Sequence, residues 1–429
     1  MPGDSLYLHL LARGGALPLG RKGPRFAVFF AACVMASFAA SAADLTEREA
    51  IDLALERSAY RNAEAARIGI AKSAVTDAGL WPNPTLGVER ERVRAAGGHN
   101  QETSVKLSQT FDLSGRRQLR REAAETRLDA ARFDLLDQRQ RTVLEVRRAF
   151  ADALYKTRQQ ARLAAWMGRI DSAIATVDRL SRAGEASGYD RRRLEREALS
   201  VRSQLLAAEA DVALAMEQLA GFLGNAPAAE YRPIGNLVPD APPPLEGLRE
   251  TLRQRPDLAS FASQSEAFDR ERRAAERQWI PDITLGVGQK RAEEQGRDDY
   301  GVILSLSIPL SVFDRGQAEE QRARAHAKAL RSERELTLTK AEANLRGVWR
   351  QAVSLRDAAL RLRPPPENSG ADLSSIAEAA YRTGERTIVE LLDAYRAELD
   401  ADMNELDLQM RARLARIDLD ALTGTQIHE

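Results

Sequence analysis

The sequence has few of the residues that covalent cross-links and metal sites require. Its 429 residues include one cysteine and four histidines. The cysteine, Cys33, lies in an N-terminal segment that we expect to be removed, so the mature chain has no disulfide and no thiolate ligand. The histidines are scattered, without the spacing of metal ligands; they are His9, His99, His326 and His428. The sequence therefore predicts no metal site and no cofactor.

Net charge and aromatic residues are also scarce. The 63 lysine and arginine residues balance 63 aspartate and glutamate residues and are interleaved with them, which argues against a nucleic-acid partner. Aromatic residues are 5% of the chain and charged residues 29%, a mixture typical of long helices rather than a thick core. We find no phosphate-binding glycine loop, no G-x-S-x-G motif and no residue pair suited to acid–base chemistry. The prediction is that the protein is not an enzyme and has no catalytic residue.

The N-terminus has the pattern of a secretory signal. Basic residues at 21–25 precede an apolar run at 26–38 and small residues at 40–42. This pattern predicts a signal peptide at residues 1–42. An uncleaved membrane anchor and a lipoprotein signal with Cys33 as the lipidated residue are the alternatives. In each case the mature chain works beyond the inner membrane.

The mature chain repeats itself. The segment WPNPTLGV (81–88) recurs as WIPDITLGV (279–287), and VKLSQTFDL (105–113) recurs as VILSLSIPL (302–310). A short R-x-G-E sequence then occurs twice, 200 residues apart, at Arg182–Gly184 and Arg382–Gly384. Self-similarity of this kind indicates a duplicated structural unit.

The repeats set the predicted boundaries. The first unit spans 43–224 and the second 245–424, each closing on a glycine. The proline-rich segment 225–244 is the predicted linker, because proline fixes the chain extended and donates no amide hydrogen bond. Residues 425–429 form a short C-terminal tail.

Each unit is expected to run helix, two strands, long helix, returning helix. In the second unit Ile283, Leu285 and Val287 alternate with Thr and Gly, and the strand at 302–308 alternates in the same way. Strands of about ten residues can cross a bilayer when tilted. Four strands cannot close a membrane barrel. The strands therefore either form small soluble sheets or combine with those of other chains.

The long helices favour the second possibility. No proline interrupts residues 115–180, which predicts a rod of about 100 Å at 1.5 Å per residue. Apolar residues near its far end step by four and three, as in a coiled coil; they are Leu163, Met167, Ile170, Ile174 and Val177. The second rod begins near Gly316, and RPPPENSG at 363–370 predicts a break or kink. The fold class is mainly α with a small β part.

At these motifs the sequence resembles the TolC family of outer-membrane efflux proteins. YRTGERTIVELLDA (381–394) is the most specific segment, and LSQTFDLSGRRQLRREAA (107–124) and LSLSIPLSVFDRGQ (304–317) also match the family. Gly115-Arg116-Arg117 resembles the branch for cobalt, zinc and cadmium efflux. The resemblance implies a homotrimer in the outer membrane, with a twelve-stranded β-barrel continued by a periplasmic α-helical barrel.

The resemblance also implies roles for individual residues at the periplasmic tip. The turns contain Arg182, Gly184, Arg382 and Gly384. Glu390 and Asp393 would form acidic rings at the lumen constriction, and links from Asp190 to Tyr381 and Arg386 would hold the tip closed. Glu390 and Asp393 lie three apart and so share one helix face, and from the residues alone a solvated face is the favoured interpretation.

The implied function is a passive exit duct of a tripartite efflux pump for heavy-metal cations. Its partners would be a periplasmic adaptor protein, an inner-membrane transporter of the RND type, and outer-membrane lipid. One alternative is a duct of the same fold for drugs, other small molecules or type I secretion. The other is a soluble periplasmic coiled-coil adaptor or scaffold.

Overall fold

Long helices and two β-hairpins build the chain. The computed structural model describes residues 43–95, 98–224, 230–294, 297–362 and 373–424, without the side chains of residues 95–99. The predicted signal peptide, the predicted kink at 363–370 and the C-terminal tail lie outside these ranges. In the described part of the chain, no helix combines the length and the hydropathy that a membrane span requires.

The first repeat contains seven elements. They are β1 (Ala43–Leu45), α1 (Glu47–Glu56), α2 (Ser58–Gly79), β2 (Thr85–Ala95), β3 (Gly98–Phe111), α3 (Arg116–Arg182) and α4 (Gly188–Leu223). The helix that opens this repeat is divided at Arg57, whose backbone is extended with ψ at 131°. The unbroken rod α3 is 67 residues long, as the lack of proline predicted.

The second repeat follows the same order. Its elements are β4 (Tyr231–Pro233), α5 (Leu245–Arg253), α6 (Pro256–Glu276), β5 (Ile283–Glu294), β6 (Arg297–Ser307), α7 (Gln317–Leu362), α8 (Leu373–Arg382) and α9 (Ile388–Thr423). Pro256 starts α6 because its fixed φ suits the first helical position. The predicted fold class, mainly helical with two tandem repeats, is confirmed. Strand β4 lies inside the predicted linker and pairs in parallel with β1, which the sequence did not indicate.

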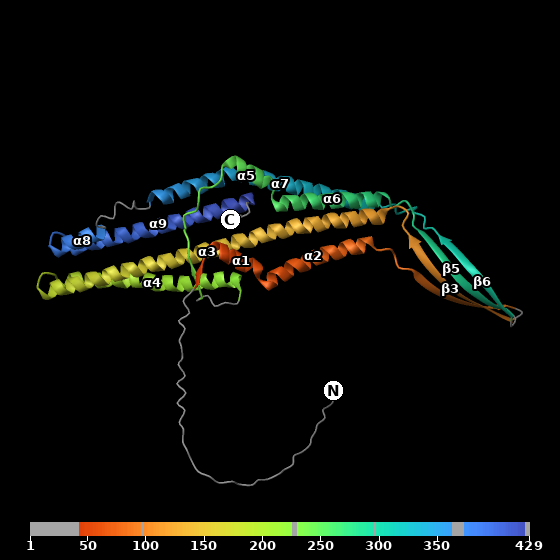
Figure 1. The fold of residues 1–429 in the computed structure, drawn as a ribbon, viewed down its shortest axis with the longest axis horizontal. Helices are drawn as coiled ribbons and strands as arrows, with labels where there is room; N and C mark the ends of the chain where they lie inside the picture. The colour runs from red at the N-terminus through yellow and green to blue at the C-terminus, as the bar shows by residue number, and fades with distance from the viewer. Residues whose placement is uncertain (1–42, 96–97, 225–229, 295–296, 363–372, 425–429) are drawn as a thin grey trace, which may run out of the picture. The chain divides into compact units, whose positions relative to one another are not determined.

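The two hairpins form one antiparallel sheet in the order β2-β3-β5-β6 (Figure 1). The register places Leu86 opposite Leu107, Leu107 opposite Val287, and Val287 opposite Leu304. One face of the sheet is therefore apolar, and it is open: Leu86 is 67% exposed and Leu304 82%. The outer edges of β2 and β6 have no strand partner among the described residues.

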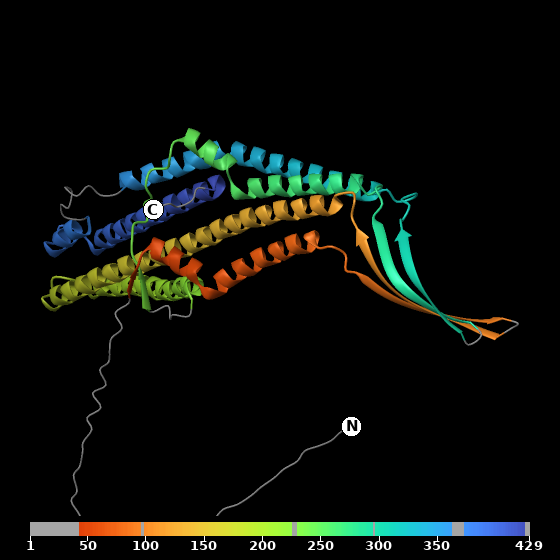
Figure 2. The same ribbon diagram turned by 45° about the vertical axis from the view of Figure 1, so that its right-hand side comes forward.

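Helix α3 is the central element of the helical part. It contacts α2, α4, α6 and α9, and α7 packs against α6 and α9 (Figure 2). The predicted coiled-coil seam is confirmed, because Leu163, Met167, Ile170 and Val177 are buried in one apolar cluster and Ile174 packs against it. This cluster joins α3, α4 and α9 beneath the two R-x-G-E turns.

Candidate functional site at the helical hairpin turns

The two R-x-G-E segments form the same turn. Gly184 has φ of 78° and Gly384 has φ of 75°, the left-handed conformation that ends many helices. The amide of Glu185 donates to the Leu180 carbonyl at 2.9 Å, and the amide of Glu385 donates to Ala380 at 2.9 Å. A glycine is needed at each turn because an L side chain is strained at this φ.

The two arginines of the R-x-G-E segments end the preceding helices. Arg182 is the last residue of α3, and Arg382 is the last residue of α8. Both side chains are exposed. A positive charge at this place is favourable, because the last carbonyls of a helix form its negative end.

A capping box starts each returning helix. The Ser187 hydroxyl accepts from the amide of Asp190 at 3.2 Å, and the Asp190 carboxylate accepts from the amide of Ser187. Thr387 and Glu390 repeat this arrangement at α9. Asp190 and Glu390 are thus equivalent residues of the two repeats. The S/T-x-x-D/E spacing in the sequence carries this signal, which our sequence analysis did not use.

Tyr381 connects the two turns. Its hydroxyl donates to Oδ2 of Asp190 at 3.1 Å, across 191 residues of sequence. Partial burial, together with the negative charge of Asp190 and this hydrogen bond, raises the pKa of Tyr381 to about 12. All three effects favour the neutral phenol. Two of the three residues predicted to hold the tip closed are therefore in contact within one chain.

The third residue of that set, Arg386, has a different partner in the single chain. Its Nη1 lies 2.5 Å from Oε1 of Glu390, one helical turn away. The Thr387 amide, and then Arg386, hold the pKa of Glu390 below its ordinary value.

Asp393 is exposed and has no hydrogen bond or ion pair with a described residue. The pKa of Arg396 is raised mainly by Glu197 and also by the nearby Asp393, so a cation lies within electrostatic reach of Asp393. Of the two predicted constriction residues, Asp393 is thus the one without a direct ion pair to a described residue.

A buried aromatic pair supports the turn of the second repeat. Tyr395 is 2% exposed, and its hydroxyl donates to Oε1 of Glu378 on α8 at 2.6 Å. Its ring meets the edge of Trp166 with the ring centroids 6.0 Å apart. Glu398 on α9 accepts from the amide of Ser374 at the start of α8. These contacts hold α8 on α9, and no motif in the sequence revealed them.

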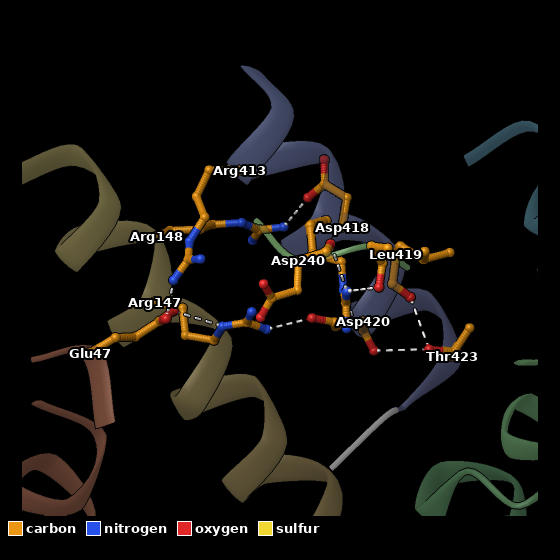
Figure 3. A network of polar contacts seen from close by, with 11 residues as sticks. Glu47, Arg147, Arg148, Asp240, Arg413, Asp418, Leu419, Asp420 and Thr423 are labelled. Atoms are coloured by element: carbon orange, nitrogen blue, oxygen red, sulfur yellow. Dashed lines mark hydrogen bonds and ion pairs between the residues drawn. The ribbon is translucent and has the colours of Figure 1, made fainter. Parts of the chain in front are cut away.

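A buried ion network joins α1, α3 and α9 (Figure 3). Arg147 donates to Oε1 of Glu47 at 2.9 Å and to Oδ2 of Asp420 at 2.8 Å. Arg416 also binds Asp420, and Arg413 binds Glu47. Burial opposes the charge on Arg147, but the carboxylates of Glu47 and Asp420 outweigh that penalty and raise the pKa of its guanidinium. In the sequence Arg147 looks like any other charge on a long helix.

No cluster of at least three His, Cys, Asp or Glu side chains suited to holding a metal ion occurs in the described ranges. His326, the one histidine with a described side chain, stacks on Phe268 with the ring centroids 4.7 Å apart.

Comparison with known proteins settles the family. Residues 50–225 and 247–425 match the profile of the family described as "Outer membrane efflux protein". The chain belongs to this family. Membership places the protein in the outer membrane, with its helices in the periplasm. The two matched segments correspond to the two repeats of the fold.

Individual relatives agree with this assignment. The chain is 26% identical to the cobalt-zinc-cadmium resistance protein CzcC of Cupriavidus metallidurans over 395 residues, which cover 90% of this chain and 91% of CzcC. It is 24% identical to the nickel-cobalt-cadmium resistance protein NccC of Alcaligenes xylosoxydans xylosoxydans, over 59% of this chain and 58% of NccC. A crystal structure of a membrane protein from Pseudomonas aeruginosa superposes with a TM-score of 0.72 at 20% identity, over 88% of this chain and 92% of that one.

Proposed function

We propose that this outer membrane efflux protein is a homotrimeric exit duct that conducts its substrate passively. Each chain contributes four strands to a twelve-stranded barrel, and the helices continue the wall into the periplasm. The energy for transport comes from an inner-membrane transporter of the RND type. A periplasmic adaptor protein links that transporter to the duct.

The open sheet carries this proposal. Strand edges with unpaired amides and carbonyls are not tolerated in hydrocarbon, so a sheet that enters lipid must be closed. The apolar face around Leu86, Leu107, Val287 and Leu304 has the length and alternation of membrane strands. Three copies joined edge to edge, β6 of one to β2 of the next, satisfy both requirements. A soluble adaptor would leave this apolar face exposed to water.

Heavy-metal cations are the proposed substrate. The names of CzcC and NccC support this choice, since both describe resistance to divalent cations. Asp393 supports it physically: three copies of an exposed carboxylate that forms no direct ion pair with a described residue would attract cations electrostatically. Glu390 contributes less, because its carboxylate is already engaged by Thr387 and Arg386.

The duct itself is tested first by extraction and sizing. We expect the mature protein to require detergent and to elute as a trimer, and the trimer to conduct ions in a planar bilayer. A monomer that is soluble without detergent would overturn the proposal and favour the periplasmic scaffold.

The substrate is tested in a deletion strain. Loss of the gene should sensitise cells to zinc, cobalt or cadmium, and the wild-type gene should restore growth. Sensitivity to a panel of drugs but to no metal would instead identify a drug duct of the same fold. Asp393→Asn should lower the cation preference of the reconstituted channel, whereas Asp400→Asn, two turns further along α9 and also exposed, is the matched control and should not.

A further inference from the structure

Basic and acidic side chains are distributed unequally between the two faces of the four-stranded sheet. In β2 the sequence alternates so that Arg90, Arg92 and Arg94 share the face of Leu86 and Val88. The glutamates between them point to the other face. Across the whole sheet the register gives the apolar face four arginines and two carboxylates. They are Arg90, Arg92, Arg94, Arg291, Glu293 and Asp298.

The opposite face of the same strands has the reverse balance. It carries five carboxylates and three cations in the same register. They are Glu89, Glu91, Glu102, Glu294 and Asp299, with Lys106, Lys290 and Arg297. When the apolar face lies against lipid in a closed barrel, the arginines therefore lie on the lipid side of the sheet. Most of the carboxylates then lie on the interior side.

The arginines lie at one edge of the apolar band. Arg90, Thr103, Arg291 and Tyr300 form the row directly after Val88, Val105 and Val302. Thr103 is eight residues from Phe111 along β3, which is about 27 Å along the strand at ~3.4 Å per residue. With a strand tilt of about 40°, this length corresponds to about 21 Å of depth, and a lipid-facing band in outer-membrane barrels is about 25 Å tall. The row therefore lies close to the end of the hydrocarbon of the outer leaflet.

The other edge of the band is aromatic instead. Trp279 is 62% exposed and Phe313 is 91% exposed on the helix side of the sheet, where interfacial aromatic side chains are expected. The arginine row thus belongs to the end of the sheet that carries the hairpin loops, and helices in the periplasm place that end at the cell exterior.

Arg90 and Arg92 keep charges that no described acidic side chain neutralises. Arg291 is neutralised by Asp298, with Nη2 and Oδ2 2.7 Å apart. Arg92 donates to the neutral amide oxygen of Gln101 at 2.9 Å, and Arg90 has no hydrogen bond or ion pair with a described residue. Both side chains are exposed. Guanidinium groups at this depth suit phosphate, which they bind through paired N–H donors.

We propose that Arg90 and Arg92 form a binding site for the phosphate groups of a glycolipid in the outer leaflet. Three copies in the trimer would give a basic ring around the barrel at headgroup depth, and lipid bound there would stabilise the assembled duct. The proposal rests on the outer-membrane trimer of the preceding section.

The test uses the purified trimer in detergent, titrated with diphosphoryl lipid A and followed by native mass spectrometry. Arg90→Gln/Arg92→Gln should weaken binding about fivefold for each arginine removed, since a basic residue near an anionic surface has a comparable effect. Lys290→Gln/Arg297→Gln removes two cations from the opposite face of the same strands and is the matched control; it should change binding less than about twofold. Equal binding by the Arg90/Arg92 variant and the wild type would overturn the proposal.

Two measurements separate the remaining possibilities. If the glutamine variant fails to assemble, unmodified trimer is compared with diphosphoryl and dephosphorylated lipid A, and equal affinity for the two overturns the proposal. Inorganic phosphate should not compete at matched concentration, and full competition would also overturn the assignment to a lipid. Conductance of the same trimer tests the duct separately: a conducting variant that keeps full lipid affinity refutes this site alone.

Discussion

The two repeats follow one plan, yet their long helices occupy different environments. Helix α3 is unbroken for 67 residues and buries large side chains such as Phe150, Trp166 and Ile170. Helix α7 is 46 residues long, and all but one of its buried residues are alanines, the exception being Leu345. The difference follows from position, because α3 lies among α1, α2, α4, α6 and α9, whereas α7 packs against α5, α6 and α9. Duplication supplied equivalent elements, and packing placed one of them at the centre and the other at the edge.

The returning helices differ in a similar way. Near its end, α9 uses Asp420 to bind Arg147 of α3, and the residue 200 positions earlier is Ala220, buried in an apolar cluster of α4. At this one equivalent position the returning helix is thus held by an ion pair in one repeat and by apolar contact in the other. The predictions below test how far the repeats are equivalent.

The largest expected effect is at this ionic contact. Asp420→Ala leaves Arg147 buried with one carboxylate fewer, and we expect it to cost about 3–5 kcal/mol of stability. Asp418→Ala is the matched control, because its pair with Arg148 is about half exposed and should contribute at most ~1 kcal/mol. Chemical denaturation of the detergent-solubilised protein measures both. Equal losses would mean that burial of the pair does not matter.

The second largest effect is expected at the two R-x-G-E turns, where equivalent glycines can be compared directly. Gly184→Ala and Gly384→Ala should each lower the free energy of unfolding by about 1–2 kcal/mol, because the backbone is left-handed at both positions. No steric clash adds to this cost, since a Cβ at either position meets no atom within 4 Å. Gly168→Ala, in the interior of α3 with equally open surroundings, should instead stabilise the protein by about 0.5–1 kcal/mol. A large difference between the two turn variants would show that the repeated turns are not energetically equivalent.

A smaller effect is expected where the repeats touch. Tyr381→Phe removes the hydrogen bond to Asp190, and we expect easier opening of the tip and a higher single-channel conductance. Tyr189→Phe is the control, because Tyr189 is exposed next to Asp190 and its ring lies under the guanidinium of Arg193. No change in conductance with Tyr381→Phe would argue against its role in closing the tip.

The same contact should depend on pH. The folded pKa of Tyr381 is about 12, above the ordinary 10.0. The stabilising contribution is therefore complete below pH ~10 and is lost as the pH rises from ~10 through ~12. Between pH ~10 and ~12, the conductance of the wild type should increase more than the conductance of Tyr381→Phe does. Identical pH profiles would contradict the assignment.

The smallest effect on stability is expected at Arg386. Arg386→Ala removes an exposed ion pair with Glu390, which should change stability very little because solvent screens such a pair. If Arg386 also holds the tip closed in the trimer, conductance should rise more than this small loss of stability implies. Arg382→Ala, at the last residue of α8 and in a longer 3.9 Å pair with Glu378, controls for removal of a positive charge from the turn. Unchanged conductance with Arg386→Ala would remove Arg386 from the closing contacts.

Much of the fold could be predicted because its signals are local or repeated. The alternation around Leu285 and Leu304, the seam from Leu163 to Val177, and Gly184 and Gly384 each depend on backbone periodicity or on a forced φ. The family followed from the motif at 381–394. The contacts of Arg147, Tyr395 and Asp420 could not be predicted, since they join residues far apart in sequence and their residue types are common on exposed helix faces.

The sequence by itself determined the duplicated plan, the lengths of the rods and strands, and the glycines at the turns, because these depend on propensities and spacings within a few residues. Only the tertiary structure decided that α3 rather than α7 lies at the centre of the helices, and that Arg386 pairs with Glu390 while Tyr381 reaches Asp190. It also decided that Arg90 of β2 shares a row with Thr103 of β3, Arg291 of β5 and Tyr300 of β6. Those outcomes depend on which helices and strands become neighbours, and no local pattern encodes that choice.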